Sequence, residues 1–240
     1  ARLPSITDGG NATAITIDSS ENVGIGTASP ASPLHIKLPN SSTAPIVTFD
    51  RNDGAVRGEI KYDDTAAVRG FEIGTTTSHD VSLKTAGNKR LEISYTGAVT
   101  MPAQPAFMVR NTAYQNNIAT GATTVAIFDE EKFDVGSNFA NNTFTAPVTG
   151  KYQLNYSINF AEFDIDFTYV WIFIATSNNG IYTSLASGKQ QRADDYATYS
   201  ASVLCDMDAN DTAQIKMTFS GGAAQADKID DSWFSGFLAC

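Results

Sequence analysis

The stretch DSWFSGFLAC, Asp231–Cys240, decides the fold because it carries large apolar side chains at consecutive positions. In an extended strand, successive side chains point to opposite faces. Trp233 and Phe237 would then lie on one face, and Phe234 and Leu238 on the other. Each face would expose apolar surface to water at a free-energy cost, so neither can be left uncovered. The segment therefore predicts a strand with a sheet beneath it and a second body above it.

The segments before this strand show the alternation that is typical of a β-sandwich. KYQLNYSINF (151–160) alternates aromatic or aliphatic side chains with polar ones, and TAQIKMTF (212–219) does the same. TYVWIFIA (168–175) is apolar on both faces, like the last strand. Turn sequences such as SNNG and DAND separate these runs. Several alternating runs closed by such turns indicate an all-β sandwich.

Residues 1–100 follow a different pattern, built from short and repeated β-segments. ITIDSSENVGI (15–25) and LEISYTGAVTM (91–101) each place two apolar pairs around a turn rich in Ser, Gly or Asn. Two-stranded units are marginal in water, so stacking, or winding with other chains, would have to supply the missing burial. The two prolines of MPAQP (101–105) mark the change to the sandwich. The pattern favours a β-rich fibre shaft.

Charge and hydropathy argue against two kinds of partner. The net charge is −10: residues 1–100 contain 9 Lys/Arg and 11 Asp/Glu, and residues 101–240 contain 7 and 15. Nucleic-acid binding depends on cationic contacts to phosphate, so this chain is not expected to bind DNA or RNA. No run of about 18 apolar residues is present, so membrane insertion is not expected either. Cations or basic partners suit the acidic half better.

A glycine-rich segment invites a phosphate-binding interpretation, but a structural one fits better. VGIGTASP (23–30) lacks the third glycine of the dinucleotide-binding pattern, and prolines follow where a helix should begin. Gly24 and Gly26 are therefore interpreted as a turn or a place of close chain packing.

No catalytic constellation is evident, and an enzyme is not expected. The only histidines, His35 and His79, lie in the predicted shaft, and neither has a neighbouring serine–glycine elbow. Three acidic pairs could be drawn as the two carboxylates of a hydrolase. However, adjacent residues of a strand point to opposite faces, so such pairs rarely share a cleft. These pairs are Asp63–Asp64, Asp194–Asp195 and Asp230–Asp231.

Two segments resemble the globular head of the complement component 1q and tumour necrosis factor superfamily. FDVGSNFANNTFTAPVTGKYQLNYSI (133–158) is similar to the segment that leads into a central strand of that family, and WFSGFLAC (233–240) to its last strand. The resemblance covers residues 105–240 and implies a ten-strand jelly roll that assembles as a trimer. It also implies that the last strand lies mid-sheet, with its second face on or near the subunit interface.

A second resemblance concerns the first half of the chain. ITIDSSENVGIGTASPASPLHI (15–36) looks like a segment of bacteriophage tail-fibre proteins that recurs along trimeric shafts. GEIKY (58–62), FEI (71–73) and VSLKTAGNKRLEI (81–93) fit the same family. The head lacks a preceding collagen repeat, unlike secreted animal members of its own superfamily. The resemblance implies an extracellular fibre on a virion and a host-surface partner.

The jelly-roll resemblance also implies where the acidic loops of the head lie. With the family's strand order, AEFDIDF (161–167), CDMDANDT (205–212) and ADKIDDS (226–232) would meet at the free end. Crowded carboxylates raise one another's pKa or recruit cations, and hard oxygen ligands suit calcium. No cofactor is required; calcium is the candidate metal, and a solvated acidic cap is the alternative. The carboxylates concerned are Glu162, Asp164, Asp166, Asp206, Asp208, Asp211, Asp227, Asp230 and Asp231.

The aromatic side chains divide into two groups. Those at alternating or family core positions are expected to form the core or the trimer contacts. These, with one aliphatic neighbour, are Phe144, Tyr152, Tyr156, Phe160, Phe219, Trp233, Phe234, Phe237 and Leu238. Tyrosines in or near polar loops suit stacking on sugars or contact with a protein receptor. These receptor-binding candidates are Tyr114, Tyr182, Tyr196 and Tyr199.

Together these features predict an all-β homotrimer, with a β-rich fibre shaft over 1–100, a linker over 101–104 and a jelly-roll β-sandwich head over 105–240. The predicted function is that of a phage tail-fibre tip, an adhesin that recognises a host cell-surface glycan or outer-membrane protein without covalent chemistry. The alternative is a head that only registers three chains and caps the shaft.

Overall fold

The computed structural model describes residues 5–7, 13–38, 44–64, 69–161, 167–178, 180–187, 196–221 and 226–240. The chain divides into two compact units, Ala1–Thr100, here the N-terminal unit, and Met101–Cys240, here the head. Strands make up all the regular secondary structure of the described residues, which confirms the all-β prediction. Among these same residues, no helix has the length and apolar character needed to cross a membrane.

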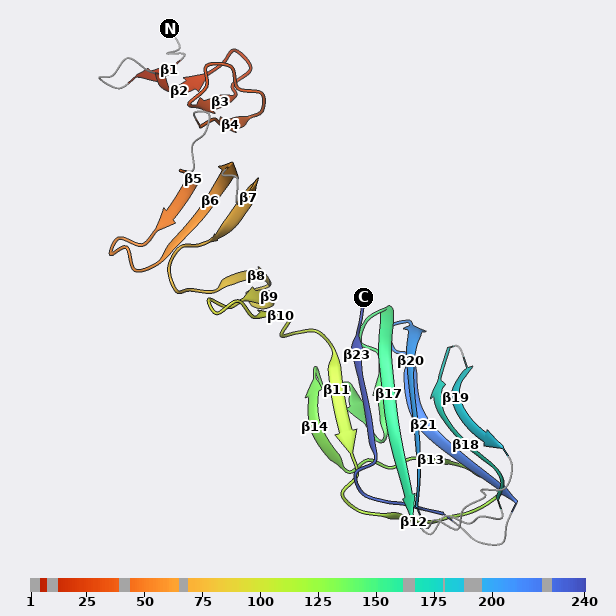
Figure 1. The fold of residues 1–240 in the computed structure, drawn as a ribbon. Coiled ribbons are helices and arrows are strands. Elements are labelled where there is room, and N and C mark those ends of the chain that lie inside the picture. Colours follow the sequence, from red (N-terminus) through yellow and green to blue (C-terminus); the bar gives the residue numbers. More distant parts are fainter. Residues whose placement is uncertain are drawn as a thin grey trace. The chain divides into compact units, whose positions relative to one another are not determined.

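The first sheet of the head contains the strand that DSWFSGFLAC forms. Its order is β14–β11–β23–β17–β20, so β23 lies mid-sheet between β11 and β17, as predicted (Figure 1). Two short strands, β22 and β12, extend the sheet past the start of β23. The bounds are β11 (Ala106–Arg110), β12 (Gln115–Ile118), β14 (Glu130–Val135), β17 (Gly150–Ala161), β20 (Tyr196–Met207), β22 (Ala226–Lys228) and β23 (Trp233–Leu238).

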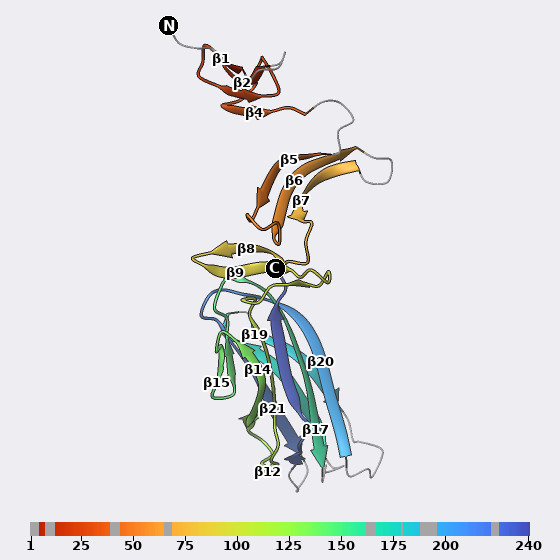
Figure 2. The same ribbon diagram turned by 90° about the vertical axis from the view of Figure 1, so that its left-hand side faces the viewer.

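The second sheet of the head has the order β15–β16–β21–β18–β19, and β13 pairs with β21 (Figure 2). The two sheets make the sandwich of a jelly roll, since strands that follow one another in the chain repeatedly change sheet. The bounds are β13 (Thr123–Val125), β15 (Phe139–Ala140), β16 (Thr143–Thr145), β18 (Phe167–Thr176), β19 (Gly180–Ser187) and β21 (Thr212–Gly221).

The core between the sheets follows the alternation of the sequence. One face of β17 is fully buried, and the inward side chains of β21 meet it from the other sheet. Aromatic rings interlock here: Phe107 stacks on Phe144 with centroids 4.6 Å apart and meets Phe234 edge-on at 5.0 Å. The buried members of the predicted core set are Phe144, Tyr152, Tyr156, Phe160, Phe219 and Phe234.

The head has two ends, which the register of β17 defines. At the Cys240 end, Gly150 pairs with Met207, and the Lys151 amide donates to the carbonyl of Cys240. At the Ala161 end, Ala161 pairs with Tyr196 and with Asp227. The twelve residues of β17 separate these ends by about 36 Å at about 3.3 Å per residue. The chain enters the head at the Cys240 end, because the Leu238 amide donates to the Pro105 carbonyl.

The N-terminal unit consists of three small sheets. Their orders are β1–β2–β3–β4, β5–β6–β7 and β10–β9–β8. The bounds are β1 (Ser5–Thr7), β2 (Thr13–Ile17), β3 (Val23–Ile25), β4 (Leu34–Ile36), β5 (Pro45–Asp50), β6 (Arg57–Asp64), β7 (Arg69–Thr75), β8 (Val81–Thr85), β9 (Asn88–Ile93) and β10 (Val99–Thr100). The buried hydrophobic cluster of the described residues belongs to the head alone.

The glycine-rich segment of the N-terminal unit packs chain against chain. Gly26 has a positive φ of 73°, and a Cβ atom there would lie 2.2 Å from the carbonyl oxygen of Lys37. This close approach occurs where β3 runs parallel to β4, and it leaves no helix start for a phosphate. The structural interpretation of this segment is therefore correct.

One charged side chain occupies a core position of the head. Lys228 is fully buried, and its Nζ lies 5.0 Å from the centre of the Phe128 ring. Among the described residues, Nζ has no hydrogen-bond partner. Burial lowers the pKa of Lys228 to about 7, and the negative charge of Asp129 only partly opposes this.

A test of backbone packing concerns Gly236, the glycine of the FSGFL segment. A Cβ atom there would lie 2.5 Å from Leu154 Cδ2 and 2.8 Å from Phe107 Cε1. Gly236→Ala is expected to destabilise the head by about 1–3 kcal/mol through overpacking. Denaturant unfolding followed by tryptophan fluorescence reports on the head, which contains Trp171 and Trp233, the only tryptophans. Ser235→Ala, next to it on the outward face, is the control, and equal stability of Gly236→Ala and the native chain would contradict the packing.

The buried amine predicts a pH-dependent stability. Because the folded-state pKa of Lys228 lies below that of the unfolded chain, the unfolded state holds more protons between about pH 7 and 10.5. The contribution of Lys228 to stability therefore rises with pH across this window. Lys228→Met should be more stable than the native chain by roughly 3–5 kcal/mol at pH 7, at about 1.4 kcal/mol per pKa unit.

The expected gain from Lys228→Met shrinks towards pH 10, because the amine of the unfolded chain then costs less free energy to deprotonate on folding. Guanidinium unfolding of both proteins at several pH values measures the difference, and other titrating groups cancel in it. A gain that does not change between pH 7 and 10 would show that folding does not lower the pKa of Lys228.

Candidate functional site

The Ala161 end of the head carries the most exposed aromatic side chains among those the structure describes in this unit. Tyr196 begins β20 and is 69% exposed, and Tyr114 lies in the loop before β12 and is 53% exposed. The adjacent strands β12, β22, β17 and β20 separate the two rings by about three strand spacings, or roughly 14 Å. Asp227 lies between them on β22.

A buried polar network holds the loops of the Ala161 end in place. Asn111 Nδ2 donates to the carbonyl of Ile229 at 2.7 Å and to that of Ala113 at 2.9 Å. Ser232 Oγ donates to the Ile229 carbonyl at 3.0 Å and accepts the Asn159 amide at 2.9 Å. These bonds tie the loops after β11 and β22 to β17. The Tyr114 loop is therefore fixed by hydrogen bonds rather than by apolar packing.

Charged groups at this end are paired with each other. Arg110 bonds to Glu130 and lies 3.2 Å from a carboxylate oxygen of Asp231. The hydrogen bond to Glu130 raises the pKa of Arg110, and hydrogen bonds from Lys132 and Arg110 lower the pKa of Glu130. All these groups are solvated, so the pairs orient side chains more than they stabilise the fold.

One further carboxylate forms part of the loop framework. Both carboxylate oxygens of Asp129 accept hydrogen bonds from Thr112, one from the amide at 2.6 Å and one from the hydroxyl at 3.0 Å. Although burial opposes ionisation, these bonds keep the pKa of Asp129 below its usual range. Asp129 thus stays ionised beside the buried Lys228.

This arrangement suits non-covalent binding. Two exposed tyrosine rings, one on a hydrogen-bonded loop and one at the start of β20, can stack on sugar rings or contact a protein. The neighbouring carboxylates Asp227, Asp230 and Asp231 add hydrogen-bond acceptors. None of these groups is arranged as a nucleophile with a base, since the two histidines lie in the N-terminal unit.

The two remaining tyrosine candidates are placed differently. Tyr199 lies within β20 with its ring turned towards the core, 6.1 Å from the Phe160 ring, and burial raises the pKa of its hydroxyl. The prediction of an exposed loop ring is therefore wrong for Tyr199, because the alternation of β20 directs it inward. Tyr182 lies in β19 opposite Ile174, and its side chain is outside the described residues.

The predicted meeting of three acidic loops at one end is wrong. The turn that follows β20 lies at the Cys240 end, and the 226–232 segment lies at the Ala161 end. The reason is strand direction: β20 runs antiparallel to β17 and ends where β17 begins. Asp206, Asp208 and Asp211 are thus a whole strand length away from Asp227, Asp230 and Asp231.

The carboxylates of the Cys240 end are engaged in local structure. Asp206 pairs with Lys151 at 2.6 Å. Asp211 accepts a 2.7 Å hydrogen bond from the Ser177 hydroxyl and another of 2.7 Å from the Asp208 amide, which closes the turn before β21. Their chemistry is therefore that of a hydrogen-bonded turn.

The described carboxylates predicted as metal ligands do not all lie at the same end of the head. Within the described ranges, no three His, Cys, Asp or Glu side chains gather closely enough to hold a metal ion. Glu162, Asp164 and Asp166 lie outside the described residues.

The outward face of the first sheet carries an uncovered apolar patch near the Cys240 end. Phe237 is 47% exposed, although its neighbours Phe234 and Gly236 are buried, so β23 alternates as predicted. Trp233 and Leu238, the other predicted contacts on this strand, are half-buried. Cross-strand registers place further apolar residues beside Phe237. The patch consists of Ala106, Met108, Phe133, Val135, Leu204 and Phe237.

Beyond the patch, the outward face along β17 and β20 is polar and has no charge between the Lys151–Asp206 pair and Tyr196, while Arg110, Glu130 and Lys132 carry charges at its β11–β14 edge. Its side chains bond across β17 and β20 in successive rungs, in which Asn155 Oδ1 accepts from the Ser202 hydroxyl at 2.7 Å. Further along, the Ser200 and Ser157 hydroxyls lie 3.0 Å apart. These rungs satisfy one another, so the face can be covered without leaving unpaired charges. The remaining rung joins Thr198 to Asn159 at 2.8 Å.

Sequence reasoning missed Leu204, Phe133 and Lys228 as notable residues. Leu204 could have been found, because the alternation in ASVLCDM that buries Cys205 turns Leu204 outward. Phe133 could not, since a bulge at Lys132 of β14 shifts the register between β14 and β11. Lys228 could have been found, because Ala226 two positions earlier lies on the same buried face.

Comparisons with solved structures give several likenesses to the head. The globular domain of zebrafish complement 1qA protein is 16% identical, with a TM-score of 0.44, 57% of this chain and 98% of that chain covered. Murine APRIL is 12% identical, with a TM-score of 0.43 and coverage of 56% and 98%. Eiger TNF from S. frugiperda is 13% identical, with a TM-score of 0.43 and coverage of 58% and 94%.

A comparison with curated proteins gave no match. The sequence pattern of the C1q domain, in contrast, matches residues 106–239, from the start of β11 to the end of β23 and one residue beyond. This span is more than half of the chain. It contains both motifs that suggested the head, and both sheets of the jelly roll. The chain therefore belongs to the C1q domain family.

Proposed function

We propose that this chain is the distal segment of a phage tail fibre and that it acts as a homotrimeric adhesin on a virion. In this proposal the N-terminal unit is the shaft and the C1q head is the tip. The head recognises a glycan or an outer-membrane protein on the host surface by non-covalent contacts. The tail-fibre motifs of the N-terminal unit support the shaft role, as does the absence of a large buried cluster from the part of this unit that the structure describes.

The observation that carries the adhesin role is the position of Tyr114 and Tyr196. Both lie at the Ala161 end, whereas Pro105 enters the head at the opposite, Cys240 end. A fibre presents to its target the end of the head that lies away from the chain entrance. Three copies of a weak site on one rigid tip would gain avidity without any new contact.

The homotrimer is supported by the outward face of the first sheet. Its apolar patch and its uncharged polar rungs match the composition expected of a surface that meets another copy.

Calcium remains a prediction for the Ala161 end. A chelator is expected to lower the melting temperature only if the ion is present there.

A specific observation also favours the second role, that of a trimerising cap. The outward face is far larger than the pair of exposed tyrosines, and it has no charges between the Lys151–Asp206 pair and Arg110. A head whose main work is to register three chains would need this face and no ligand. The two roles share the trimer and differ only in whether the tyrosines bind.

The trimer is tested by placing a charge in the apolar patch. Phe237→Arg is expected to shift the sedimenting species from trimer to monomer, because a guanidinium would be buried without a partner. Ile127→Arg is the matched control, since Ile127 is also 47% exposed but lies in the loop between β13 and β14. A native chain that sediments as a monomer, or a trimer that tolerates Phe237→Arg, would contradict the proposed assembly.

The adhesin role is tested with labelled full-length chain on a panel of bacterial strains with different surface polysaccharides. Replacing Tyr114 and Tyr196 by alanine should weaken saturable binding by about tenfold or more, as for buried aromatic anchors. Tyr95→Ala is the control, because Tyr95 is similarly exposed but belongs to the N-terminal unit. Binding to no strain, or binding that the double replacement leaves unchanged, would favour the role of a trimerising cap.

A further inference from the structure

The sheet β5–β6–β7 of the N-terminal unit has two chemically different faces. One face collects apolar side chains in register, because Ile60 pairs with Ile73 and Tyr62 with Phe71. Phe49 lies on the same face beside Gly58. The described side chains of this apolar face carry no charge. It consists of Val47, Phe49, Gly58, Ile60, Tyr62, Phe71, Ile73 and Thr75.

The opposite face is charged and internally paired. Lys61 Nζ lies 3.0 Å from a carboxylate oxygen of Glu72 and 3.8 Å from one of Glu59. Arg57 bonds to Asp50 at the end of the same sheet, at 2.7 Å. A face of paired charges is stable against water and needs no cover.

The side chains of the apolar face are more exposed than the charged side chain between them, which is unfavourable for a sheet that is free in water. Phe71 and Ile73 are 63% and 66% exposed, whereas the side chain of Glu72 between them is only 39% exposed. Three-stranded sheets become stable when a hydrophobic face is buried. The apolar face is therefore the one that needs a partner.

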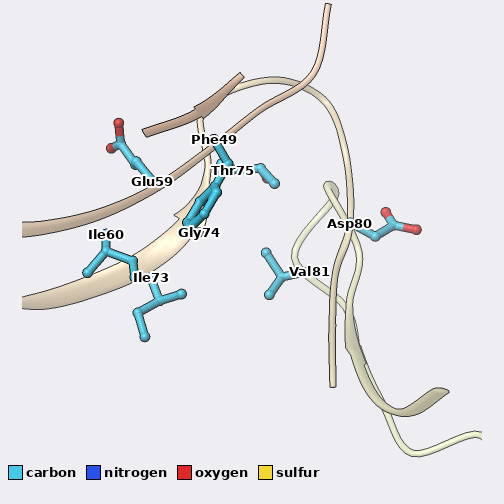
Figure 3. Close-up of a pocket in the computed structure, with 9 residues that line it drawn as sticks. Phe49, Glu59, Ile60, Ile73, Gly74, Thr75, Asp80 and Val81 are labelled. Carbon is cyan, nitrogen blue, oxygen red and sulfur yellow. The ribbon is translucent and has the colours of Figure 1, made fainter. Parts of the chain in front are cut away.

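A hollow on the apolar face helps to identify that partner. Figure 3 shows Phe49, Ile60, Ile73 and Val81 around it, with the Val81 side chain directed towards the sheet. Its volume is about 250 Å³, below the roughly 300 Å³ at which small-molecule pockets begin. Gly58 deepens the hollow because it has no side chain beneath Phe49. The hollow thus fits an inserted side chain better than a free ligand.

The same need for cover continues along the chain. In the segments after β7, apolar side chains at successive positions are also exposed. Another copy of the chain lying alongside would offer matching apolar side chains, and it would offer them in the same order along the sequence. The exposed residues are Leu83, Ile93, Val99 and Met101.

Charge supports the same partner. The chain has a net charge of −10, so two copies repel each other unless they meet through surfaces without charge. In a symmetric assembly like side chains face like side chains, and like charges would be destabilising. The described side chains of the apolar face avoid this conflict, and those of the charged face do not; the side chains of Asp64 and Arg69, which pair at the end of the sheet, lie outside the described residues.

From these observations we infer that the apolar face of β5–β6–β7 is an interface between copies of this chain, each copy covering the sheet of the next. The inference rests on the proposed homotrimer and adds that the shaft has an interface of its own, separate from the outward face of the head. Three sheets would then surround a common apolar centre, with the Lys61 face towards water.

The test compares thiol labelling at neighbouring positions of one strand in the full-length chain. Cys240 is exposed and Cys205 is buried, so Cys240→Ser provides the background. In it, Ile73→Cys places a thiol on the apolar face and Glu72→Cys places one on the charged face. A lone chain would label faster at 73 than at 72, in line with the exposures. The interface predicts the reverse, with labelling at 73 slower by about tenfold or more.

Sedimentation of the same samples separates this inference from the proposed assembly. A trimer with slow labelling at 73 supports the interface. A trimer in which position 73 labels as fast as position 72, or faster, overturns the interface and leaves the homotrimer standing. A monomer overturns both. If Ile73→Cys fails to fold, Tyr62→Cys and Lys61→Cys form a second pair on the two faces of β6, with the same expected order.

Discussion

The structure depends on one constraint: a strand has two faces, and this chain places large apolar side chains on both faces of its main sheet. In the head, the second sheet covers the inner face of β17 and β23 completely. The outer face keeps Phe237, Leu204 and Phe133 in contact with solvent. Both sheets of the head enclose the core, so neither of them covers that face. The proposed assembly would remove this surface from water.

The same constraint applies to the N-terminal unit, whose sheets are smaller than those of the head. Its three sheets are too small to enclose a core, and the described buried cluster lies entirely in the head. In the β5–β6–β7 sheet, the described charged side chains lie on one face and the apolar side chains on the other, as in a sheet of a sandwich. Among the described residues, however, no second sheet packs on its apolar face. Both units therefore leave apolar surface exposed that the proposed assembly would cover, although they differ in how much of their surface one chain buries.

Within the head, the two ends have different chemistry, and this separation organises the proposed function. The Cys240 end receives the chain, carries the apolar patch and uses its carboxylates to close turns. The Ala161 end presents two exposed tyrosine rings, that of Tyr196 at the start of β20 and that of Tyr114 on a loop that Asn111 holds by hydrogen bonds. The buried amine of Lys228 lies on β22, the short strand that joins this end to the sheet. Contacts between copies and contacts with a target can thus occupy different surfaces.

Sequence alone determined the fold class and most of the core, because period-two alternation in KYQLNYSINF and WFSGFL specifies which side chains face inward. The mid-sheet position of the last strand was predicted from the family resemblance, since alternation does not specify the neighbours of a strand. It could not determine where the acidic loops lie, since the direction of β20 relative to β17 sends Asp208 and Asp230 to opposite ends. It also placed Tyr199 in a loop, although strand pairing extends β20 far enough to turn that ring into the core. Local pattern decides which face a residue takes, whereas strand order and direction decide which residues meet, because those depend on pairings between segments distant in the chain.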